Sequence, residues 1–235
     1  MLILFDVDGT LITTHRAGVA AMGHAGRALF GPHFREDLVD YAGRLDPLII
    51  RDLLTAHGQP SDEAEVGAFR AAYREHLVRV LAVKPCPAQP CPGVVDLLEQ
   101  LHAMEHLTIG LLTGNFPETG RIKLEAAGIN VDRFRVCAWG SDSPHEPPAR
   151  EHLPEVAMAH YKQVHGRGIE SEQVVVIGDT PHDISCARAH GCRALAVATG
   201  IYGVDDLSAA DLAVQNLTDT EGIIAWLTRQ AAPAR

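Results

Sequence analysis

The first ten residues place two carboxylates at the end of a buried strand, and this constrains the fold more than any other stretch. Residues 2–5 are a short apolar run, which predicts a strand buried on both faces of a parallel sheet. Asp6 and Asp8 follow it, and then Gly9 and Thr10. Residues i and i+2 of an extended chain point to the same side, so the two carboxylates share one space. At about 4 Å apart they repel by roughly 4 kcal/mol at an effective dielectric of 20, so the pair needs a cation, a shared proton or full solvation.

A helical block separates this first strand from the others. Helices are expected over residues 19–30, 48–56 and 63–83, where no strand pattern interrupts them. The proline-rich segment 84–93 is stiff and predicts a hinge by which the chain returns to the main domain. We therefore assign residues 14–84 to a helical cap, and residues 1–13 and 85–235 to the core.

Strands and helices alternate from residue 94 onward. Strands are expected over residues 107–112, 134–138, 174–177, 194–198 and 212–214, and helices over residues 94–104, 118–127, 151–165, 187–190 and 222–227. This alternation predicts an α/β fold. We expect a three-layer, doubly wound, Rossmann-like parallel sheet with an all-helical cap inserted after the first strand.

Composition narrows the classes of partner that the protein is expected to bind. The formal net charge of the 235 residues is −10 and no basic run is present, so neither nucleic acid nor an anionic membrane surface is an expected partner. No apolar stretch approaches the length of a membrane span, and no signal-peptide pattern precedes the first strand. Five cysteines without a CxxC pair indicate reduced thiols. A cytoplasmic protein is expected, and the choice between monomer and homodimer stays open.

Polar residues follow three of the apolar runs. They are Asp6 and Asp8 after the first, Thr113 and Asn115 after the second, and Asp179 and Asp183 after a later one. Ligands of open parallel sheets bind at the carboxyl ends of the strands. We therefore expect these three groups, which are distant in sequence, to form one site.

The same groups carry a family resemblance. DVDGT at residues 6–10, TGN at 113–115 and GDTPHD at 178–183 resemble, in order, three motifs of the haloacid dehalogenase superfamily. The helical block lies where that family places a C1-type cap, and the chain is most similar to the phosphoglycolate-phosphatase-like branch. The resemblance implies a magnesium-dependent phosphatase. It would hydrolyse a small phosphorylated metabolite, phosphoglycolate-like or a sugar phosphate, through an aspartyl-phosphate intermediate.

The resemblance also implies roles for the carboxylates. Asp6 would attack the phosphoryl group, and Asp8 would protonate the leaving oxygen and then activate water. Mg²⁺ prefers oxygen ligands, which Asp6, Asp179, Asp183 and the backbone carbonyl of Asp8 would provide. Dehalogenases of the family lack the second aspartate, so Asp8 favours hydrolysis of a phosphate ester.

The groups that would hold the phosphate depart from the family pattern at one point. Thr113, the backbone amide of Gly114 and Asn115 match the second motif and are expected to bind phosphoryl oxygens. The third motif is usually a lysine just before the helix that precedes GDTPHD. Arg150 is there instead. We expect Arg150 to replace that lysine in catalysis and phosphate binding.

The lysines of the chain are expected to lie elsewhere. They are Lys84, Lys123 and Lys162. Lys123 comes ten residues after Thr113, more than two helical turns at about 1.5 Å per residue, so we expect it to lie too far along its helix to reach the phosphoryl group. The same holds for Lys162.

Substrate recognition and the rival functions depend on the cap. Residues 43–46 (GRLD) resemble a cap segment that faces the active site, so Arg44 is a candidate substrate-binding residue, and Arg16 could also reach the site. A phosphomutase of the β-phosphoglucomutase type and a non-catalytic family member remain alternatives. The cap contains no lysine before residue 83, which argues against phosphonate hydrolysis through an imine.

Overall fold

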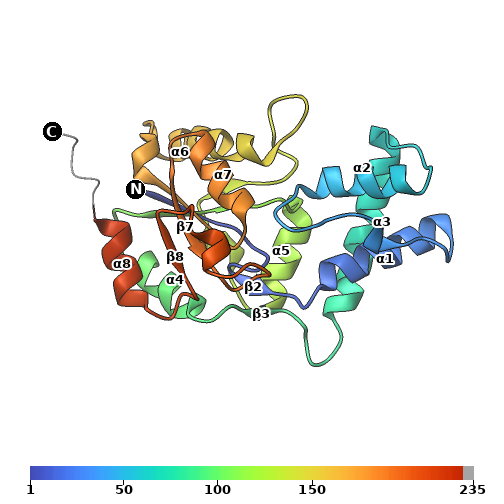
Figure 1. The fold of residues 1–235 in the computed structure, drawn as a ribbon, viewed down its shortest axis with the longest axis horizontal. Helices are drawn as coiled ribbons and strands as arrows, with labels where there is room; N and C mark the ends of the chain where they lie inside the picture. The colour runs from blue at the N-terminus through green and yellow to red at the C-terminus, as the bar shows by residue number, and fades with distance from the viewer. Residues whose placement is uncertain (230–235) are drawn as a thin grey trace.

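A computed structural model describes residues 1–229 and shows a sheet domain beside a block of helices (Figure 1). The sheet has six parallel strands in the order β5-β4-β1-β6-β7-β8, with β1 near its centre. These strands are β1 (Leu2–Phe5), β4 (Thr108–Leu112), β5 (Val136–Ala138), β6 (Val174–Gly178), β7 (Arg193–Val197) and β8 (Leu212–Val214). The predicted strands are confirmed, with ends that shift by one or two residues.

Helices cover both faces of the sheet, so successive side chains of the central strand β1 are buried on opposite sides. Ile3 and Phe5 pack with α4 (Val94–His102), α5 (Pro117–Ala126) and α8 (Thr220–Thr228). Leu2 and Leu4 pack with the helices of the other face, which are α6 (Leu153–His165) and α7 (Pro181–Ala189). Short 3₁₀ turns connect these elements: η2 (Val131–Arg133), η3 (Arg150–His152), η4 (Ser171–Gln173) and η5 (Asp205–Leu207). The predicted three-layer, doubly wound fold is confirmed.

The block of helices has its own core. It contains α1 (Ala17–Phe30), η1 (Glu36–Leu38), α2 (Asp46–Ala56) and α3 (Glu63–Leu81), packed around the buried rings of Phe69 and Tyr73. A two-residue ribbon, which the sequence did not predict, connects it to the sheet. In this ribbon β2 (Ile12–Thr13) pairs antiparallel with β3 (Gln89–Pro90). We retain residues 14–84 as the proposed extent of the cap.

The cap rests on the start of α5. Arg70 of α3 donates two hydrogen bonds to Glu118, at 2.5 and 2.7 Å, and its guanidinium lies 4.1 Å from the centre of the Phe116 ring. The backbone N–H of Asp46, at the start of α2, donates to the carbonyl of Gly114 at 2.7 Å. Helices α2 and α3 of the cap thus contact the loop and helix that follow β4.

Local sequence explains where the helices begin. Proline occupies the first turn of α2, α5, α6 and α7, where its missing N–H has no intrahelical acceptor to lose. The predicted start of α7 at residue 187 is wrong, because Thr180 and Asp183 form a capping box that begins the helix at Pro181. Of the helices described, none has the length and apolar character needed to span a lipid bilayer.

The path of the chain after the proline-rich hinge depends on Gly93. Gly93 has φ 84°, and a β-carbon there would lie 2.1 Å from the carbonyl carbon of Leu217. Gly128 has a similar φ of 79° with nothing within 4 Å of such a carbon, so it is a matched control. Gly128→Ala should lose about 1–2 kcal/mol, the cost of a left-handed residue. Gly93→Ala should lose a further 1–3 kcal/mol or so, because backbone must move. Urea unfolding measures both, and equal losses would contradict the close packing.

Candidate active site

Three carboxylates from two strand ends meet at the carboxyl edge of the sheet. Asp6 follows β1, whereas Asp179 and Asp183 follow β6. One oxygen from each lies within 4.8 Å of the others, and all three residues are buried. Because β1 and β6 are adjacent and parallel, their ends deliver these side chains to the same point. The structure therefore brings together the three carboxylate side chains that the sequence predicted for the metal, Asp6, Asp179 and Asp183.

Burial makes this cluster electrostatically costly without a cation. It raises the pKa of Asp6 to about 6, although the charge of Arg150 opposes the increase. Burial, followed by repulsion from Asp183 and Asp6, raises the pKa of Asp179 to about 8. Oxygen ligands of this kind fit Mg²⁺, whose charge would offset the repulsion.

The chain leaves room for Asp179 at the centre of the cluster. A β-carbon at Gly9 would lie 2.3 Å from Asp179 Oδ2, and one at Gly200 would lie 1.7 Å from the same atom. Thr10 Oγ1 also donates to Asp179 Oδ1 at 3.2 Å. Two glycines and one hydroxyl thus fix the position of this carboxylate within the cluster.

Arg150 is the cation of this cluster. It lies in η3, only 5% exposed, and its Nη2 donates to Asp183 Oδ1 at 2.5 Å and lies 3.2 Å from Asp6 Oδ1. Its Nη1 donates to the carbonyl of Gly43 in the cap, and its buried Nε has no hydrogen-bond partner among the described residues. Burial would lower the pKa of Arg150, but Asp183 and Asp6 outweigh it and raise the pKa, so the charge is fixed. The Nε–H of Arg150 could therefore donate to an additional oxygen.

Asp183 supports this arrangement from behind. Its Oδ1 accepts from Arg150, and its Oδ2 accepts from the backbone N–H and the hydroxyl of Thr180. It does not line the cavity that contains the other carboxylates. Both oxygens are therefore already engaged, and Asp183 orients Arg150 as well as adding charge to the carboxylate cluster.

Asp8 has a different set of partners. Its Oδ2 accepts from Lys123 Nζ at 2.6 Å and from Asn115 Nδ2 at 2.9 Å. Asn115 Oδ1 also accepts from Lys123 at 2.6 Å, and Asn115 donates to Thr113 Oγ1 at 2.8 Å. Burial alone would lower the pKa of Lys123, but Asp8, Tyr73 and Asp46 outweigh it and raise the pKa. A second fixed cation thus lies beside the second aspartate.

The expectation that Lys123 is too far from the site was wrong. Helix α5 begins at Pro117 and passes alongside the site toward the cap, so a residue in its second turn faces Asp8 and the long lysine stem spans the remaining distance. Rise per residue measures distance along the helix axis and says nothing of which face points to the site. The spacing of Thr119 and Lys123 indicates their shared face, because residues i and i+4 of a helix lie on one side, and both are buried on α5. Lys162 is exposed on α6, as expected.

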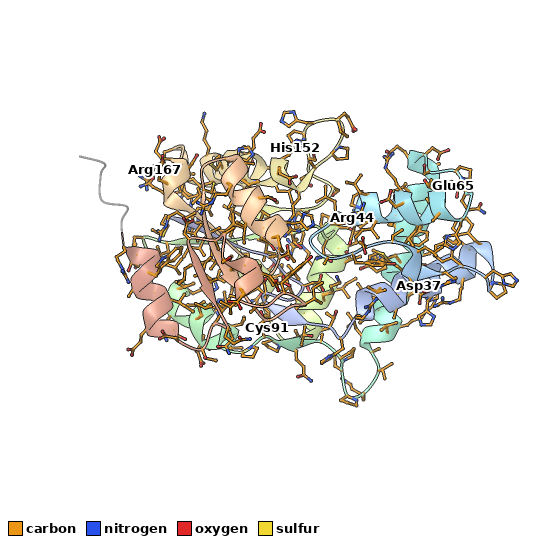
Figure 2. The ribbon with its side chains drawn as sticks, in the orientation of Figure 1. Asp37, Arg44, Glu65, Cys91, His152 and Arg167 are labelled. Atoms are coloured by element: carbon orange, nitrogen blue, oxygen red, sulfur yellow. The ribbon has the colours of Figure 1, made fainter. Side chains whose placement is uncertain are left out.

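A cavity of about 950 Å³ lies between the core residues and the cap. The core contributes Asp6, Asp8, Thr113, Gly114, Asn115, Lys123, Arg150 and Asp179, and the cap contributes Arg16, Val19, Met22, Tyr41, Arg44, Ile49 and Tyr73. Arg44 lies at the junction of the two parts (Figure 2), where its Nη2 donates to Asp52 at 2.5 Å. Arg16 has a left-handed backbone with φ 65°. Both cap arginines line the predicted site.

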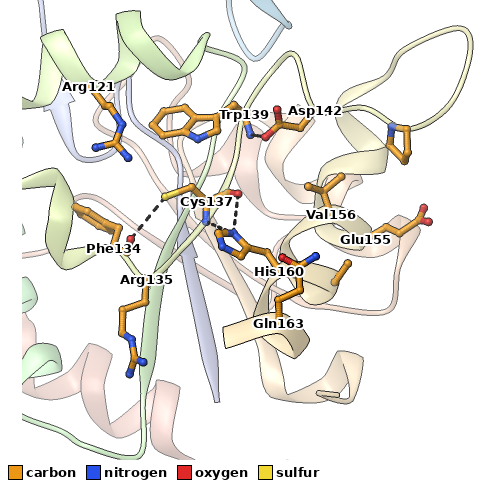
Figure 3. Close-up of a pocket in the computed structure, with 12 residues that line it drawn as sticks. Arg121, Phe134, Arg135, Cys137, Trp139, Asp142, Glu155, Val156, His160 and Gln163 are labelled. Carbon is orange, nitrogen blue, oxygen red and sulfur yellow. Dashed lines mark hydrogen bonds between the residues drawn. The ribbon is translucent and has the colours of Figure 1, made fainter. Parts of the chain in front are cut away.

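A second cavity of about 680 Å³ lies at the outer edge of the sheet (Figure 3). Trp139, His160 and Arg121 line it, and His160 contacts the backbone of Cys137 on the edge strand β5. None of the residues predicted for phosphate chemistry lies there. The cavity between core and cap is the candidate active site.

Comparison with known proteins identifies the class. The haloacid dehalogenase-like hydrolase family matches residues 3–197, and the chain belongs to this family. It is 30% identical over 223 residues to a phosphoglycolate phosphatase from Chromobacterium violaceum, covering 92% of this chain and 93% of that protein. It is 24% identical to the pyrophosphatase PpaX of Halalkalibacterium halodurans, covering 86% of each. A hydrolase from Pseudomonas syringae has the same fold, with a TM-score of 0.69 at 22% identity over 96% of this chain and 97% of that one. The predicted family and enzyme class are confirmed.

Proposed function

We propose that this hydrolase is a magnesium-dependent phosphatase that acts on a small phosphorylated metabolite through an aspartyl-phosphate intermediate on Asp6. The observation that carries the proposal is the unequal setting of the two aspartates after β1. Asp6 is buried beside Arg150 and Asp179. Asp8 has one oxygen held by Lys123 and Asn115, whereas its Oδ1 has no hydrogen-bond partner among the residues described. One carboxylate is placed to attack and the other to exchange a proton.

The residues would act in two steps. In the first, an Asp6 oxygen bonds to phosphorus, the bond to the leaving oxygen breaks, and Asp8 donates a proton to that oxygen. In the second, Asp8 takes a proton from water, which attacks the acyl-phosphate and releases inorganic phosphate and free Asp6. Arg150 would neutralise charge on Asp6 and the transferred group, and Thr113 with the amide of Gly114 would hold phosphoryl oxygens.

Magnesium would be held by Asp6 and Asp179 with the backbone carbonyl of Asp8, and Asp183 would add its charge from behind. When bound, the ion supplies positive charge that neutralises the phosphoryl oxygens. We propose a cytoplasmic location, which agrees with five cysteines that are all unpaired.

The substrate is proposed to be small and anionic. Two relatives are named for phosphoglycolate and pyrophosphate hydrolysis, and both compounds carry more than one anionic group. Arg16 and Arg44 line the cavity from the cap. Screening phosphorylated metabolites for release of inorganic phosphate tests the proposal. An isomerised phosphoester without free phosphate would instead support the phosphomutase alternative.

Metal removal should abolish activity and reduce stability. The raised pKa values of Asp6 and Asp179 stabilise the metal-free fold at acidic pH, and this contribution is lost as pH rises through about 6 to about 8. Mg²⁺ competes with protons for these oxygens, so it should raise the Tm more at about pH 8 than at about pH 5.5. Scanning calorimetry with chelator and with Mg²⁺ measures this. A pH-independent shift that persists in Asp179→Asn would contradict the assigned ligands.

Substitutions of the two aspartates should differ in how their effects depend on the leaving group. Asp6→Asn should form no phosphoenzyme with any substrate. Asp8→Asn should lose a factor of about 10²–10⁴ with an alkyl phosphate and much less with p-nitrophenyl phosphate, whose leaving group needs little protonation. Rapid-quench measurement of labelled protein tests both. A phosphoenzyme in Asp6→Asn would place the nucleophile elsewhere.

Replacing Arg150 should affect all substrates. Arg150→Ala should lower kcat/KM by about 100-fold or more, as expected for one strong charge-stabilising donor. Arg150→Lys should recover part of this, because it retains the charge but not the guanidinium, whose Nη2 contacts Asp183 and Asp6 while its Nη1 donates to Gly43. Arg188→Ala is a matched control, since that arginine pairs with Asp211 on the surface. Near wild-type activity in a folded Arg150→Ala would overturn the assignment.

A further inference from the structure

We infer that Lys123 is a positioning residue for Asp8, and that the cap completes its setting through Tyr73. The inference rests on the proposed phosphatase function and deepens it. Lys123 would not bind the transferred phosphoryl group. It would fix the carboxylate that exchanges the proton, and it would do so only while the cap rests on the core.

The hydrogen bonds at Asp8 are one-sided. Lys123 and Asn115 both donate to Oδ2, at 2.6 and 2.9 Å, and they are tied to each other by the 2.6 Å bond from Lys123 to Asn115 Oδ1. This closed triangle fixes the rotation of the Asp8 side chain. Its Oδ1 is left without a partner among the described residues, in a side chain that is 40% exposed to the cavity. The arrangement aims one oxygen at the reacting groups.

The lysine itself is held from the cap. Its side chain is 5% exposed, and the hydroxyl of the fully buried Tyr73 of α3 lies beside its ammonium. Gly18 of α1 leaves space for both: a β-carbon there would lie 3.2 Å from Lys123 Nζ and 3.3 Å from the Tyr73 oxygen. Two cap helices therefore form one wall around the ammonium, and the core residues Asp8 and Asn115 form the other. A cap displaced from the core would leave a buried lysine without that wall.

The two fixed cations have separate partners. Arg150 contacts Asp6 and Asp183, whereas Lys123 contacts Asp8 and Asn115. Charge on the nucleophile and orientation of the proton donor are thus assigned to different residues. Loss of Arg150 should slow every substrate, but loss of Lys123 should slow a substrate in proportion to its need for a proton on the leaving oxygen.

A double-mutant cycle on the Mg²⁺-loaded full chain tests this, using Lys123→Met, Asp8→Asn and the combined variant. Lys123→Met should lower kcat with an alkyl phosphate by about 10²-fold, while p-nitrophenyl phosphate loses less than about tenfold. In the Asp8→Asn background, adding Lys123→Met should change the rate little, because both changes remove the same function. Tyr73→Phe retains the ring and should show a smaller loss with the same leaving-group dependence. Lys162→Met, on the exposed face of α6, is the matched control and should match wild type.

Four outcomes separate the possibilities. Equal losses with both substrates and additivity with Asp8→Asn would show that Lys123 acts on the phosphoryl group, and would overturn the inference. A folded Lys123→Met with wild-type rates on both substrates would also overturn it. Absence of phosphate release by the wild-type protein on every substrate would instead reject the proposed function. If Lys123→Met fails to fold, Tyr73→Phe provides the test. A wild-type dependence on the leaving group in that variant would contradict the inferred role of the cap.

Discussion

The burial of like charges at one edge of the sheet is the constraint on which this structure depends. Asp6, Asp179 and Asp183 are enclosed within a few ångströms of one another, and a buried carboxylate without a partner is strongly destabilising. The protein offsets the repulsion only in part, with the fixed charge of Arg150. The remaining deficit of positive charge is a property of the fold. It is also what makes the site suited to a divalent ion and a phosphate together.

The candidate active site is shared between the sheet domain and the cap, whose hydrophobic cluster also includes Phe116 at the start of α5. Arg150 of the sheet domain donates to the carbonyl of Gly43 in the cap, and Asp46 of the cap donates to the carbonyl of Gly114 in the sheet domain. The cap is thus seated on the loops that contain the candidate site residues. In the proposed mechanism, recognition of the leaving group and orientation of the reacting groups would therefore be coupled through a few hydrogen bonds.

Most of the sheet and its carboxylate edge could be predicted from the sequence, because buried parallel strands are short apolar runs and their carboxyl ends converge. Lys123 could not be placed by counting along α5, since its role depends on which helix face meets Asp8. The early start of α7 depends on the capping box of Thr180 and Asp183, a local hydrogen-bond pattern that apolar periodicity does not indicate. The β2–β3 ribbon could not be predicted, because two residues per strand show no periodicity. Sequence spacing identifies side chains at strand ends, but not side chains that reach the site from the face of a helix.

The β2–β3 ribbon has a consequence for how this architecture diversifies. The chain leaves the sheet domain at Thr13 and returns at Gln89, and these two residues are paired side by side. A segment whose two ends are adjacent can be lengthened, shortened or exchanged without altering the path of the flanking chain, as in a loop between two neighbouring strands. Recognition and chemistry can therefore evolve at different rates in one polypeptide. A different cap would change the cap side of the cavity, while the carboxylates at the sheet edge stay in register.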